Sequence, residues 1–348
     1  MDLKTHNGVE NIPIDGNKTG AVEQESDANL VSKVGLVSVI MPAFNVEKYI
    51  GDAIRSVLKQ TYPFFELIIV DDGSTDRTRE VVNSFDDERI VLLTHEKNRG
   101  VAEARNTALK EARGKWVALI DADDVCLPER LEKLLLILYE RNEGKYFVAD
   151  DQIVCFDSND GLKKWGSSFK LYYNSIKFSG GVADFSFSDY ISHNAPAIHP
   201  IFPIEAVRDN HLLFRQEYVP GEDFLFYCEL FKAGYNLILT REAYYLYRLT
   251  PGSITSRRPK ETSVDAIAFL LSKYRFSEEE SAALKRFLRK TKADFEYNTF
   301  TYHLKRREIY ESVKYLLRNP MLGFKLLLRL PISLRYRIRA KISGGKVK

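Results

Sequence analysis

The chain has 348 residues, of which 45% are hydrophobic and 28% are charged, as is typical of a folded globular protein with a sizeable core. Its formal net charge is only +3, and its three cysteines lie too far apart for a disulfide framework or a zinc site, which favours a reducing cytoplasm. The polar first residues contain no signal peptide, and no apolar run reaches the ~18 residues of a membrane-spanning helix.

Charge is distributed unevenly between the two ends of the chain. Residues 1–35 carry six acidic residues and three lysines, and the stretch 1–34 is expected to be a disordered lead-in. From residue 305 to the end there are thirteen Lys or Arg and only two acidic residues. A basic end of this strength predicts an anionic partner.

Predicted strands and helices alternate over the first ordered part of the chain. Apolar runs predict strands near residues 36–41, 67–70, 90–93 and 116–120. Apolar residues at helical spacing predict helices near 47–60, 75–85 and 101–113. This alternation is typical of an α/β fold with a doubly wound, mostly parallel, Rossmann-like sheet. Later in the chain, strands, aromatic residues and glycines are mixed with one clear helix, over residues 222–233.

Three aspartates, Asp121, Asp123 and Asp124, follow the apolar run that ends at Ile120. Carboxylates gathered at a strand end repel one another unless a cation lies between them, and Mg²⁺ and Mn²⁺ prefer oxygen ligands. The alternative is a turn that is merely rich in aspartate. A second strand, 67–70, is followed by acidic residues over 71–76. Both polar clusters lie at the carboxyl ends of predicted parallel strands, where such sheets bind ligands, and together they indicate a nucleotide-sugar site.

An ordered set of motifs resembles family 2 inverting nucleotide-sugar glycosyltransferases, which have the GT-A fold. The motifs are residues 38–45 (SVIMPAFN), 71–76 (DDGSTD), 98–100 (NRG), 104–106 (ARN), 121–124 (DADD) and 221–223 (GED). The match spans about residues 37–255, and residues 172–258 resemble bacterial exopolysaccharide enzymes of the succinoglycan kind. The resemblance implies a GT-A domain over residues 35–257, with a nucleotide-sugar half (35–125) and an acceptor half (126–257). A basic, helical C-terminal region follows over 258–348.

The resemblance implies that the donor is a UDP-sugar. It gives Asp72 a hydrogen bond to the uracil ring, whereas the structural alternative is that Asp72 caps the next helix. It places Arg105 near the nucleotide, and the alternative, held equally open, is a solvated helix charge. The remaining residues implied in donor binding are Pro42, Ala43, Phe44, Asn45, Asp121, Ala122 and Asp123.

The resemblance also implies a divalent metal and a catalytic base. Asp123 is expected to bind Mn²⁺ or Mg²⁺ on the diphosphate, and Asp124 is a second candidate ligand. Inversion needs one general base, and the resemblance gives this role to Asp223 in preference to Glu222. Acids at the start of a helix are also favoured by the helix dipole alone.

Further candidates lie in the acceptor half. His193 and His199 are candidates to line the acceptor channel, although a lone histidine is more often structural. Arg248 and Ser253 resemble part of a loop that lies near the diphosphate in the family. Arg248 is a candidate to neutralise phosphate charge.

The predicted function is transfer of a hexose, with glucose as one candidate, from a UDP-sugar to a hydroxyl of a lipid-linked oligosaccharide in exopolysaccharide or other surface glycan synthesis. The alternative is a catalytically silent UDP-sugar-binding scaffold subunit. A nucleotidyltransferase is disfavoured, because the loop after the first strand reads Pro-Ala-Phe-Asn instead of a glycine-rich triphosphate loop.

The basic tail from residue 315 onward mixes leucines with Lys and Arg, as in an interfacial helix on an anionic bilayer. The alternative is a helix packed on the catalytic domain. We expect a cytoplasmic protein that lies peripherally on the inner face of the plasma membrane. No nucleic-acid partner is expected, because no nucleic-acid-binding module accompanies the charge.

Overall fold

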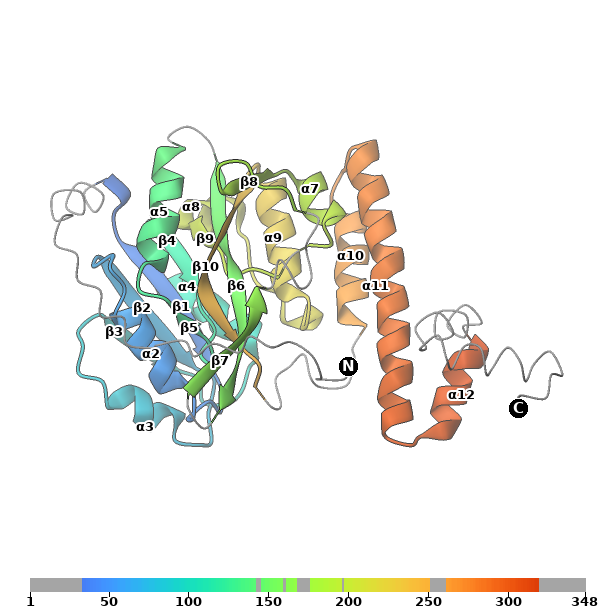
Figure 1. Ribbon diagram of the computed structural model, residues 1–348, viewed down its shortest axis with the longest axis horizontal. Coiled ribbons are helices and arrows are strands. Elements are labelled where there is room, and N and C mark those ends of the chain that lie inside the picture. The colour runs from blue at the N-terminus through green and yellow to red at the C-terminus, as the bar shows by residue number, and fades with distance from the viewer. Residues whose placement is uncertain are drawn as a thin grey trace, which may run out of the picture.

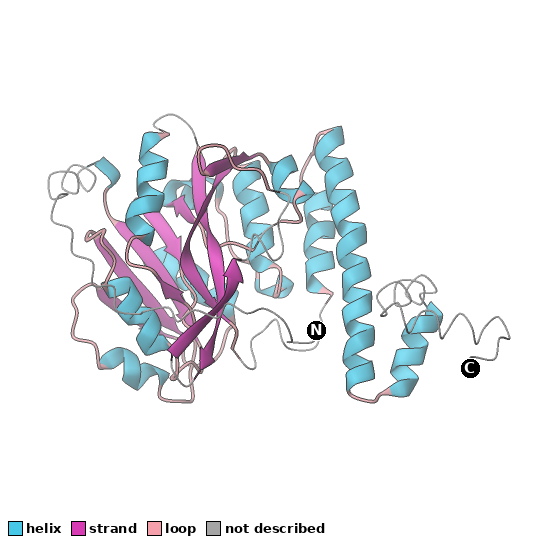
Figure 2. Ribbon diagram, viewed as in Figure 1, coloured by secondary structure: helices cyan, strands magenta, loops and turns pink. Residues whose placement is uncertain are grey.

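One twisted sheet of ten strands forms the centre of the molecule (Figures 1 and 2). The computed structural model describes residues 33–141, 145–158, 161–167, 176–195, 197–250 and 261–318. The strand order is β3-β2-β1-β4-β9-β6-β10-β5, with β7 paired to β6 and β8 paired to β10. The tail beyond residue 318, the lead-in up to residue 32 and Ser253 lie outside the described residues.

The first half of the sheet is parallel and confirms the predicted fold class. Its strands are β1 (Val37–Ala43), β2 (Phe65–Asp71), β3 (Ile90–Thr94) and β4 (Trp116–Leu119). The connecting helices are α2 (Ile50–Leu58), α3 (Thr78–Asn83) and α4 (Val101–Glu111). Every residue of β2 is buried, which explains why its sequence is a continuous apolar run instead of an alternating one.

The second half adds both antiparallel and parallel strands. They are β5 (Val125–Cys126), β6 (Tyr146–Ser158), β7 (Gly161–Ser167), β8 (Val182–Phe185), β9 (Ile201–Pro203) and β10 (Asn236–Arg248). The helices are α5 (Arg130–Glu140), α7 (Phe187–Ser192), α8 (Ile204–Asn210), the 3₁₀ turn η1 (Gln216–Tyr218) and α9 (Glu222–Lys232). The short strand β9 joins the two halves, because it pairs antiparallel with both β4 and β6.

Three helices complete the described chain: α10 (Thr262–Lys273), α11 (Glu278–Lys305) and α12 (Ile309–Arg318). Figure 1 shows α10 and α11 lying side by side next to α9, with α12 farther from the sheet. Leu270 of α10 and Leu284 of α11 belong to the same buried cluster as Leu225 and Phe231 of α9. Helices α10 and α11 therefore pack against α9. The basic tail from residue 315 onward, for which membrane contact and packing on the protein are the two alternatives, lies mostly outside the described residues. Within the described part of the chain, every helix is too short or too polar to cross a membrane.

Candidate active site

The aspartate turn at the end of β4 is the centre of the site. The Asp124 backbone N–H donates to the Asp121 carbonyl oxygen at 3.1 Å, which closes the turn and leads the chain into β5. Because β5 pairs antiparallel with the end of β10, Tyr245 lies over this turn. The Tyr245 hydroxyl donates to Asp124 Oδ2 at 2.7 Å and accepts the Asp121 backbone N–H at 3.1 Å. The turn is thus built into the protein and is more than a surface loop rich in aspartate.

Arg105 lies between two acidic parts of the site. Its Nη2 donates to Asp121 Oδ1 and its Nη1 donates to Glu222 Oε1, both at 3.0 Å. The side chain is buried, and its guanidinium lies 5.2 Å from the centre of the Phe214 ring. The solvated alternative for Arg105 is therefore wrong. The guanidinium connects α4, the aspartate turn and the start of α9.

His199 contacts the second carboxylate oxygen of Asp121. Its Nε2 lies 3.2 Å from Asp121 Oδ2. Desolvation in the site raises the pKa of Asp121, but the charge of Arg105 and the hydrogen bond from His199 lower it by more, so the net pKa is below its usual value. Asp121 is consequently a stable carboxylate at neutral pH.

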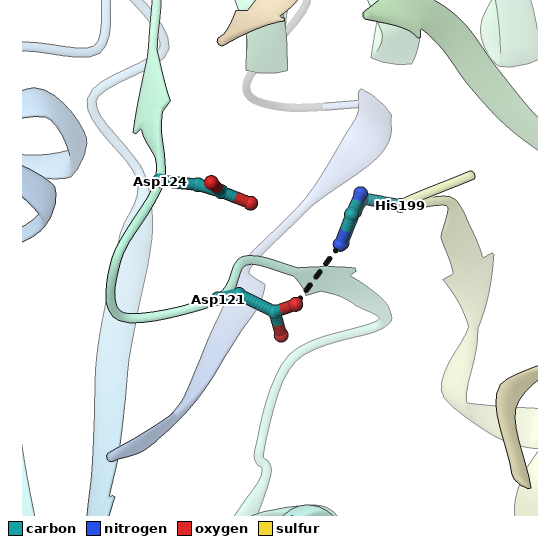
Figure 3. A group of neighbouring side chains, drawn as sticks. All are labelled: Asp121, Asp124 and His199. Carbon is teal, nitrogen blue, oxygen red and sulfur yellow. Dashed lines mark hydrogen bonds and ion pairs between the residues drawn. The ribbon is translucent and has the colours of Figure 1, made fainter. Parts of the chain in front are cut away.

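Three side chains could hold a metal ion together. One atom each from Asp121, Asp124 and His199 lie within 4.8 Å of one another, and Figure 3 shows these atoms facing a common space. Burial and then the charges of Asp123 and Asp121 raise the pKa of Asp124 well above its ordinary value. A divalent cation between these groups would remove that repulsion, so the residues present fit the metal that the fold family implies.

The predicted metal ligand Asp123 stands outside this cluster. Its side chain is partly exposed, and its Oδ2 accepts a hydrogen bond from the Thr250 hydroxyl at 3.0 Å. Burial and the nearby charge of Asp121 raise its pKa. The buried Ala122 separates it from Asp121 within the turn.

Glu222 and Asp223 open helix α9, directly after Gly221. Glu222 is buried, and burial together with the charge of Asp223 raises its pKa to about 7 despite the neighbouring Arg105. Asp223 is partly exposed, and its Oδ1 accepts the Phe224 backbone N–H at 2.6 Å. No described residue hydrogen-bonds its other carboxylate oxygen. Asp223 is therefore the more accessible of the two carboxyl groups.

Asp72 organises the loop that precedes α4. Its Oδ1 accepts from the Arg99 backbone N–H at 2.9 Å and contacts His95 Nδ1 at 2.6 Å, and its Oδ2 accepts from the Gly100 N–H at 2.7 Å. The alternative that Asp72 only caps the helix near residue 75 is wrong, because these contacts go to the later loop. The proposed contact with uracil must use the remaining lone pairs of these oxygens.

The loop after β1 carries the other predicted donor residues. Pro42 and Ala43 end the strand, and Phe44 is 39% exposed, which leaves its ring free for stacking. Asn45 has a positive φ of 53°, and its Oδ1 accepts the Thr75 backbone N–H at 2.8 Å. Asn45 thus ties the loop after β1 to the loop after β2.

The predicted residue His193 packs away from the aspartate turn. His193 ends α7, and its ring lies 5.1 Å from Phe185 on β8. Strand β8 pairs with the beginning of β10, at Leu237–Thr240, whereas Tyr245 lies near the end of that strand. The structure therefore does not bring His193 to the aspartate turn.

The Arg248 guanidinium pairs with Asp52 at 3.2 Å and with Asp157 at 3.4 Å, while its backbone N–H donates to Asp124 Oδ1 at 2.7 Å. Its side chain is thus already neutralised by two carboxylates. Arg248 contacts the site through its backbone N–H, and its charge acts to lower the pKa of Asp123, while the expected contact with phosphate finds no support in this arrangement.

Sequence reasoning missed the residues that hold His199 in place. The ring stacks on Tyr245, with centroids 4.1 Å apart and planes 7° apart, and Nδ1 lies 3.0 Å from Gln152 Nε2. The fully buried Arg130 donates to the His199 carbonyl oxygen and pairs with Asp150 at 3.0 Å. No local pattern marks Gln152 or Tyr245, because both lie inside strands; Arg130 could have been noticed only as a charge within an apolar helix.

Comparisons with known proteins identify relatives of this chain. The model of the family described as "Glycosyl transferase family 2" matches residues 38–196. The Escherichia coli UDP-Glc:alpha-D-GlcNAc-diphosphoundecaprenol beta-1,3-glucosyltransferase WfgD is 34% identical over 230 residues, which cover 65% of this chain and 82% of WfgD. The Rhizobium meliloti succinoglycan biosynthesis protein ExoO is 29% identical over 68% of this chain and 67% of its own.

The fold is also similar to a solved structure. The mannosyltransferase PcManGT from Pyrobaculum calidifontis, in complex with GDP-Man and Mn²⁺, matches with a TM-score of 0.56 over 83% of this chain and 82% of its own, at 17% identity. That likeness concerns the fold. The motifs, their position at the carboxyl ends of the strands and the extent of the match to WfgD together show that this chain belongs to glycosyltransferase family 2.

Proposed function

We propose that this protein is an inverting glycosyltransferase that moves a hexose from a UDP-sugar to a hydroxyl of a lipid-linked acceptor in the synthesis of a surface glycan. The observation that carries the proposal is Arg105, which holds the aspartate turn and the acidic start of α9 side by side. The names of WfgD and ExoO support a UDP-sugar, a lipid-linked acceptor and a surface polysaccharide.

The chemistry assigns different roles to the two carboxyl groups of α9. Inversion is a single displacement in which one base removes the proton of the acceptor hydroxyl as its oxygen attacks the anomeric carbon. Asp223 is partly exposed and has an oxygen without a described partner, so it can receive that proton. Glu222 is buried, and its carboxyl group is engaged by Arg105. Glu222 therefore positions the site and Asp223 acts as the base.

The aspartate turn receives the donor. Asp124 and its neighbours Asp121 and Asp123 would hold Mn²⁺ or Mg²⁺, and the metal would supply Lewis-acid stabilisation of the departing diphosphate. Asp121 is held by Arg105 and His199, so its direction is set before the donor arrives. Phe44 offers an exposed ring against which the uracil ring of the donor can stack.

We also propose a peripheral location on the inner face of the plasma membrane. The thirteen Lys or Arg residues from position 305 onward would lie against anionic lipid, where the lipid-linked acceptor is found. Most of this basic segment lies outside the described residues, so the proposal rests on its composition.

The decisive experiment measures UDP release from a panel of UDP-sugars with lipid-linked acceptors, with Mn²⁺ or Mg²⁺ and then with EDTA. We expect acceptor-stimulated, metal-dependent release with one sugar. UDP-sugar binding without product under every condition would favour the silent scaffold subunit, or mean that the true acceptor is missing from the panel. UDP release that persists in EDTA would mean that the protein is a transferase that works without a metal ion.

A further inference from the structure

Two large apolar side chains lie exposed at the α11–α12 corner, residues 304–310. Tyr310 is 77% exposed, and Leu304 is 48% exposed. Because α11 and α12 are joined by a short turn, both side chains flank the same bend. The side chains of Arg306 and Arg307 are also exposed on this turn. Exposed apolar and aromatic side chains beside arginines are typical of surfaces that enter the boundary between lipid headgroups and acyl chains.

The charge of this end of the protein favours an anionic surface. The acids next to the turn, Glu308 and Glu311, each pair with a basic neighbour at 2.9 Å and 3.5 Å. Residues 319–348, which follow α12, contain eight Lys or Arg and no acidic residue. At its other end, α11 begins with three glutamates, residues 278–280. An anionic bilayer therefore attracts the corner and repels the far end of α11.

The corner projects past the proposed base. Lys232, at the end of α9, pairs with Glu280 near the start of α11 at 3.7 Å. Phe224, near the start of α9, packs on Phe287 with ring centroids 5.4 Å apart, so the two helices run antiparallel. From Phe287, α11 continues for roughly another 25 Å beyond the level of Asp223, at about 1.5 Å per residue. Figure 1 shows the corner at the same end of the molecule as α3, which follows the carboxyl end of β2.

We propose that the α11–α12 corner is the surface by which this protein docks on an anionic lipid bilayer, with Leu304 and Tyr310 in the headgroup interface. The inference rests on the proposed transfer to a lipid-linked acceptor at the membrane. It adds the residues that touch the bilayer and the orientation of the protein on it. Because α10 and α11 share a buried cluster with α9, the corner keeps a fixed position relative to Asp223. Docking at the corner therefore turns the proposed base toward the bilayer that holds the acceptor.

A fluorescent reporter reads the position on the bilayer directly. The three native cysteines are buried, so a cysteine introduced at an exposed position of the full-length protein is labelled selectively. Tyr310→Cys and the control Phe64→Cys are each labelled with the environment-sensitive dye nitrobenzoxadiazole. Phe64 is a matched control because it is 48% exposed and directly precedes β2, at the opposite end of the sheet from the donor loops.

The labelled proteins are mixed with vesicles of phosphatidylcholine, with or without about 30% phosphatidylglycerol. At position 310 we expect a blue-shifted emission and quenching by spin-labelled lipids, with the anionic vesicles only. At position 64 we expect neither effect. A dye at position 310 that stays in water while the protein is bound to vesicles would overturn the proposal, as would a protein that does not bind anionic vesicles.

A double variant tests whether these side chains supply the binding. Leu304→Ser combined with Tyr310→Ser should weaken binding to the anionic vesicles, measured by co-sedimentation, by about ten-fold or more, because two apolar side chains no longer enter the bilayer. Phe64→Ser should stay within about two-fold of the wild type. Equal binding of the double variant and the wild type would assign attachment to residues 319–348 alone and overturn the proposal. If the double variant does not fold, the dye at position 310 still decides the question.

The outcome is separable from that of the proposed function. Vesicle binding is measured without UDP-sugar, whereas UDP release with detergent-solubilised acceptor tests transfer without a bilayer. Transfer by a protein that does not bind vesicles would leave the transferase standing and remove the docking surface. A dimer in light scattering that forms through Leu304 and Tyr310, without vesicle binding, would assign the corner to a second copy of the chain and overturn the proposal.

Discussion

Arg105 shows how a single buried charge can organise a site. A guanidinium removed from water is costly unless carboxylates surround it, and here Asp121 and Glu222 each accept one of its N–H groups at 3.0 Å. Asp223, Asp123 and Asp124 add further acidic groups in the same region. The acids outnumber Arg105, and Arg248 is already paired with Asp52 and Asp157, so a divalent cation would relieve the repulsion among the carboxylates of the aspartate turn.

At the residue scale, Asp223→Asn tests the proposed base. Asparagine keeps the size of the side chain but cannot take a proton, so kcat should fall by ~10²–10⁴-fold. UDP-sugar affinity, measured by calorimetry, should stay within about three-fold, because the proposed base acts on the acceptor and not on the donor. Asp209→Asn, an exposed acid on α8, is the control. Near-normal turnover in Asp223→Asn would remove Asp223 from the mechanism.

The raised pKa of Glu222 predicts how the free energy of unfolding depends on pH. Its pKa is raised from 4.5 in the unfolded chain to about 7 in the fold, so the folded state binds more protons between these values. Stability from this group is therefore present below pH 4.5 and is lost as pH rises to 7, by about 3 kcal/mol if the full shift is realised.

The comparison of wild type with Glu222→Gln isolates this contribution. Urea unfolding without metal, repeated between pH 4.5 and 7.5, should give a free energy of unfolding that declines with pH more steeply in the wild type. Parallel pH profiles for the two proteins would show that Glu222 ionises normally in the fold.

At the element scale, the N-terminus of α4 is closed by protein groups. Asp72 accepts the N–H groups of Arg99 and Gly100, and Gln216 Oε1 from η1 accepts the Ala102 N–H at 3.2 Å. Helix N-termini often bind phosphate, but here protein side chains accept the N–H groups of Arg99, Gly100 and Ala102. This arrangement sets the direction of α4 and thereby the position of Arg105 one turn later.

A substitution at Gly100 tests how the N-terminus of α4 is closed. It has a φ of 97°, and an added Cβ would lie 2.2 Å from the Gln216 side chain. Gly100→Ala therefore combines backbone strain with displacement of the cap, whereas Gly234→Ala (φ 89°, no atom within 4 Å) carries the strain alone. We expect Gly100→Ala to lose at least ~1 kcal/mol more in urea unfolding than Gly234→Ala. Equal losses would mean that Gln216 moves away without cost.

At the scale of the whole molecule, the C-terminal helices are joined to the catalytic half by a common core and by a buried carboxylate. Glu229 of α9 is 1% exposed and pairs with Lys273 at 2.8 Å and with Arg215 at 3.3 Å, and it accepts from the Tyr274 hydroxyl at 2.8 Å. The helix that begins with the proposed base is thus anchored, two turns later, to the end of α10.

Leu270→Ala tests this connection. Leu270 of α10 is fully buried, so its truncation should cost about 2–4 kcal/mol in the free energy of unfolding. Leu304→Ala on α11, where the side chain is 48% exposed, should cost no more than ~0.5 kcal/mol. Tryptophan fluorescence and circular dichroism should report one transition in both variants. Two separate transitions would show that the C-terminal helices are an independent unit.

The sequence alone determined the parallel half of the sheet, the class of the fold and the family, because apolar periodicity and short motifs are local properties of the chain. It also placed the acids at the carboxyl ends of strands. Only the tertiary structure decided which side chains meet: Arg105 and Glu222 are 117 residues apart, Tyr245 and Asp124 are 121 apart, and His199 and Asp121 are 78 apart. Such contacts depend on strand register and on the packing of distant segments, and no local pattern records them.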